Sequence, residues 1–411
     1  MPRVLLLLPS ASYRAEDFVA AAGRLGIELV VAAEYRQALS AVMGDRALRV
    51  DLRDPQAAVT SIVAHAGQVA LDGIVAADDQ GVQVAALAAE RLGLPHNSPE
   101  AVAATRDKAL FRRRLDGSPV RQPAFRVAHA GADVAALVAD IGPPCVLKPV
   151  SLSGSRGVIR VDDPSDAPGV AERIRRILED AGLDRNEPLL VESFVAGPEV
   201  AVEALLSDGR LEVLAVFDKP DPLEGPYFEE TIYTTPSRLP RGVLDRAEEA
   251  VAATAGQLGL RHGPVHAELR MTNAGPVMLE LAARSIGGLC SRALRFGAGI
   301  SLEEVILLHA AGLPIAGLRR DLQASGVMML PIERAGRLVA VEGVAQARDV
   351  PGVVGVEITI PAGRQVVRLP EGDRYLGFVF ATAATPHDVE QALRDGHARL
   401  RVVIDADAST A

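Results

Sequence analysis

This sequence has little cysteine, no tryptophan and no excess of positive charge. Only two cysteines, Cys145 and Cys290, occur in 411 residues. So few thiols exclude a disulfide framework and fit a reducing compartment, and we expect both side chains to be inert packing groups. The formal net charge of −10 argues against nucleic acid as the main partner, because phosphate backbones are bound by basic faces.

The apolar run at the start of the chain is short. The opening segment, MPRVLLLLPSASY, has five consecutive apolar residues before a proline. Such a run is too short for a secretory h-region or a membrane span, so it predicts a buried strand. We therefore expect a cytoplasmic protein with no membrane partner. The chain length predicts about two to four globular domains.

Residues 1–98 alternate between apolar strands and helices. This alternation predicts a Rossmann-like parallel sheet with helices on both faces. PSAS follows the first strand, where a dinucleotide-binding domain would carry G-x-G-x-x-G, so a dinucleotide cofactor is not expected. The predicted strands are 4–8, 27–32, 48–50 and 73–76, and the predicted helices are 15–25, 35–43, 56–66 and 82–92.

The following segments are suited to a nucleotide. One helix is predicted from Ser98 through Lys108 to Leu115. A strand at 145–149 then places Lys148 beside the loop SLSGSRG, where a point charge and backbone N–H groups could wrap phosphates. The loop is not a P-loop, and taken alone it is a weak signal, because Gly/Ser-rich loops are usually ordinary connections.

Residues 189–199 continue with a strand, a tight turn and a carboxylate. The backbone at 193–195 could pair with an adenine edge, and Glu199 could accept hydrogen bonds from ribose hydroxyls. The alternative is a hairpin with surface glutamates. Farther along, the aromatic and acidic loop at 225–231 is too irregular for a core element and is suited to covering a substrate.

The segment VHAELRMTNAGPVMLELAARSIGG, 265–288, predicts a β-hairpin that carries Glu268 and Glu280. His266 and Glu268 should share a face, because side chains alternate along a strand. Paired carboxylates favour a hard divalent cation such as Mg²⁺, which typically shares its ligands with nucleotide phosphates. Arg284 could clamp a carboxylate or a phosphoryl group. The alternative is a partly buried hairpin with surface glutamates.

From about residue 325 the pattern changes to strands at 327–332, 338–342, 353–360 and 375–383, a helix at 386–400 and a strand at 400–404. We interpret this segment as a small α+β domain with few residues suited to chemistry. The predicted domains are 1–98, 99–325, with a lid at about 124–196, and 326–411.

Five motifs in order, DKALFRRRL, VLKPVSLSGSRGV, VESFVAGPEVAVE, HAELR and MLELAARSIGG, resemble the ATP-grasp superfamily over residues 1 to about 320. The segments FDKPDPLEGPYFEETIYTTP and RYLGFVFATAATPHDVEQAL look like the L-amino acid ligase group. The resemblance implies an ATP-grasp fold of α/β and α+β parts, with ATP and Mg²⁺ as cofactors and Mn²⁺ as an alternative ion. It assigns nucleotide binding to Lys108, Lys148, Ser153, Gly154, Ser155, Glu192, Phe194, Val195, Glu199 and Lys219.

The same resemblance implies metal binding by Glu268 and Glu280, and catalytic roles for Lys148, Arg284 and Glu230. It predicts a carboxylate–amine ligase that works through an acyl-phosphate and acts on small molecules, with a homodimer left open. Two alternatives remain. One is another ATP-grasp ligase, of the purine-biosynthesis or biotin-carboxylase type, and the other is an inactive ATP-binding regulator. One departure bears on the number of ions: Ala282 stands where many ATP-grasp enzymes have an asparagine ligand.

For the substrate, an acid on one wall and an arginine on the other suit a zwitterion. We expect the ammonium at Glu230 and the reacting carboxylate at Arg284, so the carboxylate donor should be amino acid-like. Gly288, four residues after Arg284, should leave room for a medium to large side chain. The alternative is that Glu229 and Glu230 are solvated loop charges.

Overall fold

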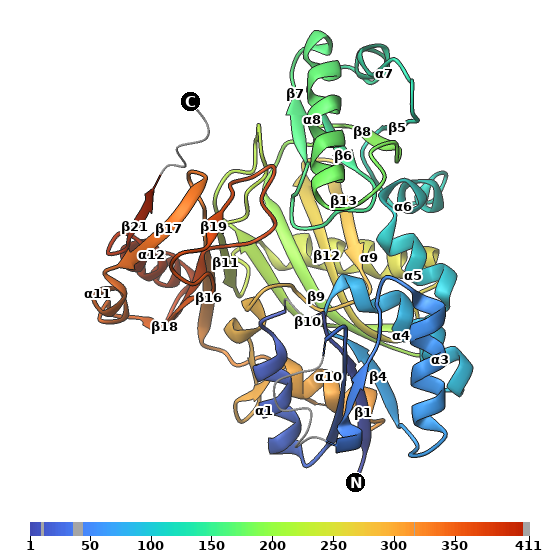
Figure 1. Cartoon of the computed structure of the whole chain (residues 1–411). Helices are drawn as coiled ribbons and strands as arrows, with labels where there is room; N and C mark the ends of the chain where they lie inside the picture. The colour runs from blue at the N-terminus through green and yellow to red at the C-terminus, as the bar shows by residue number, and fades with distance from the viewer. Residues whose placement is uncertain (10–11, 36–43, 316, 406–411) are drawn as a thin grey trace.

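A computed structural model describes residues 1–9, 12–35, 44–315 and 317–405. The first part is a parallel four-stranded sheet of order β3-β2-β1-β4, at the bottom of Figure 1. The predicted strands and helices are present to within a few residues, but the helix predicted at 35–43 lies, from residue 36 on, outside the described residues. The elements are β1 (Arg3–Leu7), α1 (Ala15–Leu25), β2 (Glu28–Ala33), β3 (Ala47–Arg49), α3 (Pro55–Ala66), β4 (Gly73–Ala76) and α4 (Asp79–Leu92).

The single helix predicted from residue 98 to 115 is wrong, because the structure has two: α5 (Pro99–Arg106) and α6 (Lys108–Leu115). Asp107 adopts an extended conformation between them, and its side chain accepts hydrogen bonds from Ala109 N and Leu110 N at 2.8 and 2.9 Å. An aspartate at this position satisfies the orphan N–H groups of a new helix. The break places Lys108 in the first turn of α6, where its N–H bonds Val150 O at 3.1 Å.

The segment predicted as a lid, here called the lid, contains a separate four-stranded antiparallel sheet of order β5-β8-β6-β7, at the top of Figure 1. It has its own hydrophobic core, in which Cys145 is fully buried. Its elements are β5 (Phe125–Ala128), α7 (Val134–Ile141), β6 (Cys145–Pro149), β7 (Ile159–Val161), α8 (Ala167–Asp180) and β8 (Leu189–Ser193).

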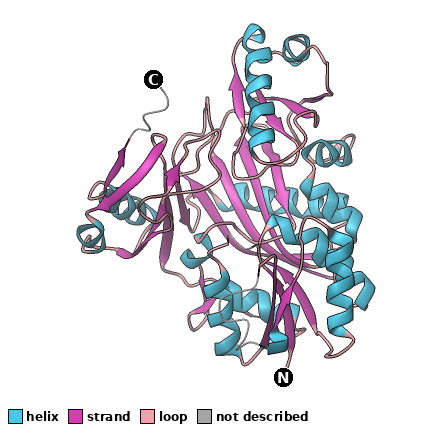
Figure 2. Ribbon diagram, in the orientation of Figure 1, coloured by secondary structure: helices cyan, strands magenta, loops and turns pink. Residues whose placement is uncertain are grey.

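The largest sheet is antiparallel and has eight strands, in the order β13-β12-β9-β10-β11-β16-β20-β18 (Figure 2). Three of its strands come from the C-terminal segment, so residues beyond 325 share a sheet with the strands before them. Its elements are β9 (Glu199–Ser207), β10 (Arg210–Lys219), β11 (Ile232–Thr235), β12 (Gly263–Thr272), β13 (Gly275–Ala282), β16 (Ala324–Leu330), β18 (Val353–Ile358) and β20 (Gly377–Ala383).

The remaining elements cover or extend this sheet. A small sheet of order β19-β17-β21 lies in the C-terminal segment. No described helix is long and apolar enough to cross a bilayer. The bounds are α9 (Arg241–Leu258), β14 (Arg295–Phe296), β15 (Ile300–Ser301), α10 (Leu302–Ala310), β17 (Gly336–Glu342), α11 (Val344–Arg348), β19 (Gln365–Val366), α12 (Pro386–His397) and β21 (Arg401–Asp405).

One hydrophobic core joins the three parts of the chain around the large sheet. It packs Leu6 of β1 with Phe217 of β10 and Phe378 of β20, all fully buried. A side chain from the first ten residues thus shares a core with one near residue 380. The N-terminal sheet and the C-terminal strands are therefore held against the same central scaffold, and the loops between them meet at one place.

Gly326, on β16, tests how tightly the C-terminal strands pack. A Cβ atom there would lie 2.6 Å from the carbonyl oxygen of Tyr233 and 2.7 Å from a methyl carbon of Val389. We expect Gly326→Ala to destabilise the protein by about 1–3 kcal/mol through overpacking, measured as a lower midpoint of thermal unfolding. Gly242→Ala is the control, because nothing lies within 4 Å of that position. Equal midpoints for both variants would contradict this packing.

Candidate active site

One cavity lies where the N-terminal sheet, the lid, the large sheet and the C-terminal segment meet, and each part contributes to its wall. The parallel sheet presents the carboxyl ends of its strands here, as open α/β sheets commonly do at binding sites. Of the residues predicted for the site, all except Lys219 line the cavity: Lys108, Lys148, Ser153, Gly154, Ser155, Glu192, Phe194, Val195, Glu199, Glu230, Glu268, Glu280 and Arg284.

The lid loop after β6 forms one wall. Gly154 and Ser155 have φ values of +65° and +55°, and their backbone N–H groups have no acceptor among the described residues. Backbone N–H groups presented in this way suit an anion. Lys108 supports the loop, because its Nζ donates to Leu152 O at 2.5 Å. The donors of this wall fit the phosphates that the sequence motifs predict.

Lys148 is held by a buried ion-pair chain that the sequence reasoning missed. Its Nζ lies 2.6 Å from Glu192, whose other oxygen lies 2.5 Å from Arg112 Nε. Burial opposes the ionisation of Glu192, but Arg112 and Lys148 hold the pKa of its carboxyl below the usual value. The Glu192 carboxylate therefore orients Lys148 and is not free to meet a nucleobase. Arg112 lies one helical turn after Lys108, and that spacing was the available signal.

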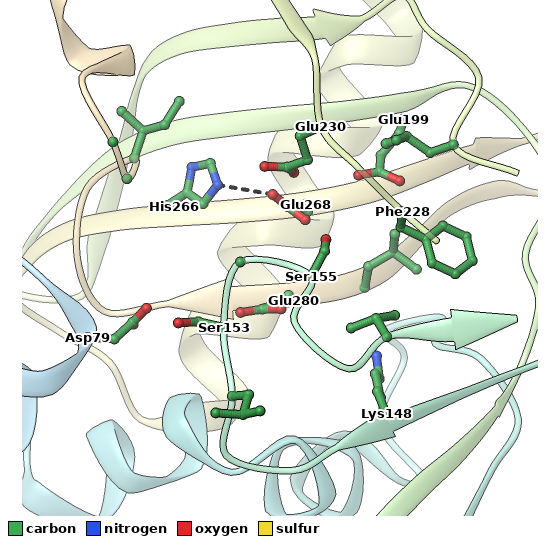
Figure 3. A pocket seen from close by; sticks show the side chains of 18 of the residues that line it. Asp79, Lys148, Ser153, Ser155, Glu199, Phe228, Glu230, His266, Glu268 and Glu280 are labelled. Carbon is green, nitrogen blue, oxygen red and sulfur yellow. Dashed lines mark hydrogen bonds and ion pairs between the residues drawn. The ribbon is translucent and has the colours of Figure 1, made fainter. Parts of the chain in front are cut away.

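Lys219 lies just behind the cavity wall, among three carboxylates. Its Nζ is 2.6 Å from Glu199, 2.5 Å from Glu230 and 3.0 Å from Glu268. Figure 3 shows these three carboxylates turned toward one another. Burial opposes the charge on Lys219, yet the three acids hold its pKa well above the usual value. The lysine is thus a structural cation in contact with the site.

Among the described residues, these same three acids each offer an oxygen within 4.8 Å of the others, as metal ligands would, but the ammonium of Lys219 already contacts all three. The sequence reasoning paired Glu268 with Glu280 instead. The hairpin itself is confirmed, with Glu268 directly opposite Glu280 between β12 and β13. The backbone of Glu280 belongs to the hairpin ladder, but its carboxylate has no hydrogen-bond partner among the described residues and lies beside the lid loop in Figure 3. Metal binding by the Glu268–Glu280 pair stays a prediction.

His266 and Glu268 lie on the same face of β12, as predicted, and are joined at 3.3 Å (Figure 3). The other ring nitrogen of His266 pairs with the buried Glu203. Glu203, on β9, also accepts a hydrogen bond from the N–H of Ile286 at 3.0 Å. This bond connects β9 to the loop after β13. Burial alone would lower the pKa of His266, but the charge of Glu203 raises it to about 9.

Arg284 is fixed across the junction with the N-terminal sheet. Its Nη2 lies 2.9 Å from Asp79, at the start of α4, and Arg106 approaches the same carboxylate at 3.5 Å. Burial opposes ionisation, but the two arginines hold the pKa of Asp79 at about 2. The sequence reasoning missed Asp79, because no local pattern links it to a residue 205 positions away.

Two substrate-side predictions need correction. Gly288 does not open space, because a Cβ atom there would lie 3.0 Å from the Phe378 ring, and its φ of +62° itself favours glycine. The C-terminal segment is also richer in chemistry than predicted, because Asp373 and Tyr375 line the cavity. The Tyr375 hydroxyl lies 3.4 Å from Glu230, which also accepts from the Tyr233 hydroxyl at 2.7 Å.

Comparison with known proteins agrees with this geometry. Residues 141–293 match the model of the ATP-grasp domain, residues 19–96 that of the ATP-grasp N-terminal domain, and residues 328–405 that of L-amino acid ligase C-terminal domain 2. The chain belongs to the ATP-grasp superfamily. Within it, the chain carries the C-terminal domain of L-amino acid ligases, so the resemblance and the fold inferred from the sequence are confirmed.

The crystal structure of an L-amino acid ligase from Bacillus licheniformis superposes with a TM-score of 0.81 at 22% identity, covering 98% of this chain and 99% of that one. Alanine–anticapsin ligase of Bacillus subtilis is 27% identical over 61% of this chain and 56% of its own length. Carnosine synthase 1 of Homo sapiens is 32% identical over 61% of this chain, but the match spans only 31% of that protein.

His266 makes the stability of the metal-free protein depend on pH. Its folded pKa lies above its unfolded value, so the ion pair with Glu203 contributes fully below about pH 6.5 and is lost as the pH rises through about 9. We compare the midpoints of thermal unfolding of wild type and His266→Gln, with a chelator present. The excess in the wild-type midpoint should be largest near pH 6 and should shrink toward pH 9. The exposed His129→Gln is the control. A difference that does not change with pH would contradict the ion pair.

Proposed function

We propose that this protein is an ATP-dependent ligase that joins a carboxylate to an amine through an acyl-phosphate, with ADP and phosphate as products. The observation that supports this most is a single cavity in which unpaired lid N–H groups and Lys148 face Arg284 and the acids of β12 and β13. Relatives named as ligases of amino acids support the same reaction. ATP, when bound, supplies the phosphoryl group that activates the carboxylate.

Residues of three segments would bind and orient the nucleotide. Lys148, held by Glu192, and the N–H groups of Gly154 and Ser155 would meet the phosphates. At the hinge, the N–H of Phe194 is taken by Pro144 O, so Val195 offers the backbone N–H for a nucleobase edge. Glu199 is left to meet the ribose, although Lys219 and Arg270 share its oxygens.

The acidic side of the cavity fits a divalent cation of the Mg²⁺ or Mn²⁺ type, because its donors are hard carboxylate oxygens. Glu280 has its carboxylate free, while Glu268 is shared with Lys219 at 3.0 Å. Glu268 and Glu280 would hold the ion, and the charge of Lys219 limits how many further carboxylates take part. Ala282 offers no ligand, so water or phosphate oxygens would complete the shell.

For the substrates, Arg284 is set to face the reacting carboxylate, because Asp79 fixes its guanidinium at the cavity wall. Glu230 remains our candidate for the ammonium of an amino acid-like donor. The purine-biosynthesis type is less well supported: its solved relatives share the fold at about 14% identity, and the C-terminal domain matches that of amino acid ligases. An inactive regulator is disfavoured, because the metal and arginine positions are kept.

The test of the reaction is a screen for phosphate release with ATP, Mg²⁺ and pairs of amino acids or other carboxylates and amines. ADP and a condensed product should appear in equal amounts for at least one pair. Phosphate release without any condensed product, or the absence of turnover for every pair, would contradict the ligase.

Glu280→Gln should remove a metal ligand without harming the fold, because the carboxylate has no hydrogen-bond partner among the described residues. We expect turnover to fall by about a hundredfold or more, since metal ions stabilise several kcal/mol of transition-state charge. Glu249→Gln, on the exposed face of α9, is the matched control. Near wild-type turnover of Glu280→Gln in Mg²⁺ would exclude this residue as a ligand.

Lys148→Met and Glu199→Gln should separate two parts of the nucleotide site. Lys148 would meet phosphate charge that develops during reaction, so its loss should lower kcat strongly. Glu199 would meet a ribose that does not change, so its loss should mainly raise the KM for ATP. Steady-state kinetics with ATP varied and the other substrates saturating measure both kcat and the KM for ATP. Equal losses of kcat in the two variants would contradict these roles.

A further inference from the structure

The lid is joined to two loops that reach the substrate side of the cavity. The first, residues 224–230, is here called the acidic loop, and the second, residues 370–375, the C-terminal loop. Both lie outside the lid in sequence, yet the lid holds each of them by backbone and side-chain contacts. In Figure 1 the lid stands above the segment that contains these loops.

The acidic loop is packed into the lid. Tyr227 adds its ring to the lid's hydrophobic core and pairs with Ile159 of β7 as an isolated bridge. Arg160 adds two hydrogen bonds to this contact. Its backbone N–H donates to Pro226 O at 2.9 Å, and its guanidinium donates to Glu224 O at 2.8 Å. The acidic loop is therefore attached to the lid by packing, a backbone bridge and hydrogen bonds.

The C-terminal loop is bound by the same lid. Gly157 N donates to Pro370 O at 2.9 Å, and Arg156 Nε donates to Glu371 O at 2.9 Å. Both donors belong to the loop that carries the free N–H groups for phosphate. A lid loop ordered around phosphates would thus also order residues 370 and 371.

Arg173, on α8, connects the two loops. Its Nε lies 2.6 Å from the Glu371 carboxylate, and its Nη1 lies 2.6 Å from the Tyr227 hydroxyl. The guanidinium also lies over the Tyr227 ring, 5.2 Å from its centre. The planar fork of arginine can donate to two acceptors at once, and lysine has no such fork. About a third of each side chain of the Arg173–Glu371 pair is exposed, so the pair can break and form again.

Beyond these contacts, both loops run into the cavity wall and converge on Glu230. Phe228, next to Tyr227, stacks on Phe194 with ring centres 6.3 Å apart. On the other loop, Tyr375 approaches Glu230 at 3.4 Å. Arg173 therefore contacts the two loops that carry Phe228, Glu230 and Tyr375 to the cavity wall.

We propose that Arg173 is a positioning residue that latches the acidic loop and the C-terminal loop to the lid, so that nucleotide-driven lid closure builds the substrate pocket. The proposal rests on the proposed function, because it takes the lid to close over ATP. Coupling of this kind is reciprocal, so a bound carboxylate substrate should also tighten ATP binding. Arg173 itself does not line the cavity.

The test is hydrogen exchange with and without the non-hydrolysable analogue AMP-PNP and Mg²⁺. In wild type, the analogue should slow exchange at 151–158 and in both loops. In Arg173→Ala, protection at 151–158 should remain, while the nucleotide-dependent protection of both loops is lost, with exchange there about tenfold faster, in keeping with common coupling strengths. Arg173→Lys should restore the C-terminal loop more than the acidic loop. Arg176→Ala should behave as wild type, because Arg176 is exposed on the same helix and, among the described residues, its ion pair is with Glu172 alone.

Kinetics give a second readout once the screen provides substrates. Arg173→Ala should raise the KM of the carboxylate about tenfold and leave that of ATP within about twofold when the carboxylate is low. Tyr227→Phe, which removes only one hydroxyl, repeats the exchange test if Arg173→Ala does not fold. Full nucleotide-dependent protection of both loops in Arg173→Ala would contradict the proposed role of Arg173 without contradicting the ligase function. The absence of protection at 151–158 in wild type contradicts ATP binding itself, and the latch with it.

Discussion

The ion cluster around Lys219 is the constraint on which the site depends. Three carboxylates from β9, β12 and the acidic loop meet one ammonium at 2.5 to 3.0 Å. Without this charge, the three acids would be buried beside one another, at a cost that only a cation or protonation relieves. Lys219 therefore holds together elements that are up to 69 residues apart in the chain, as Glu199 and Glu268 are. The substrate wall and the nucleotide wall share this one support.

Buried ion pairs also connect the other parts of the fold. Arg112 joins α6 to the lid through Glu192, and Asp79 joins the N-terminal sheet to Arg284. A buried pair is weak evidence for stability, because desolvation offsets much of the attraction, but breaking one partner leaves an uncompensated charge. These pairs are therefore best understood as fixing geometry. They align charged groups from separate parts of the chain around one cavity.

The lid and the substrate side are physically continuous through Tyr227 and Glu371. This continuity gives the C-terminal segment a role that its sequence does not suggest. Its strands add to the large sheet, and its loop at 370–375 reaches the cavity, so the domain with the fewest recognisable motifs completes the site. In our proposal, a ligase built this way would assemble its substrate pocket only when the lid is in place.

Local patterns in the sequence predicted most of the elements, the hairpin of Glu268 and Glu280, and the resemblance to the superfamily, because apolar periodicity, turn residues and ordered motifs are local; the break at Asp107 between α5 and α6 was not predicted. Nearly all the residues that the sequence predicted for the site line the cavity, although many other lining residues were not predicted. Only the tertiary structure decided the partners: Glu192 is committed to Lys148, Lys219 is surrounded by acids, and Phe378 fills the space beside Gly288. Ion pairs and close packing depend on distances between elements far apart in the chain, and no local pattern records those distances.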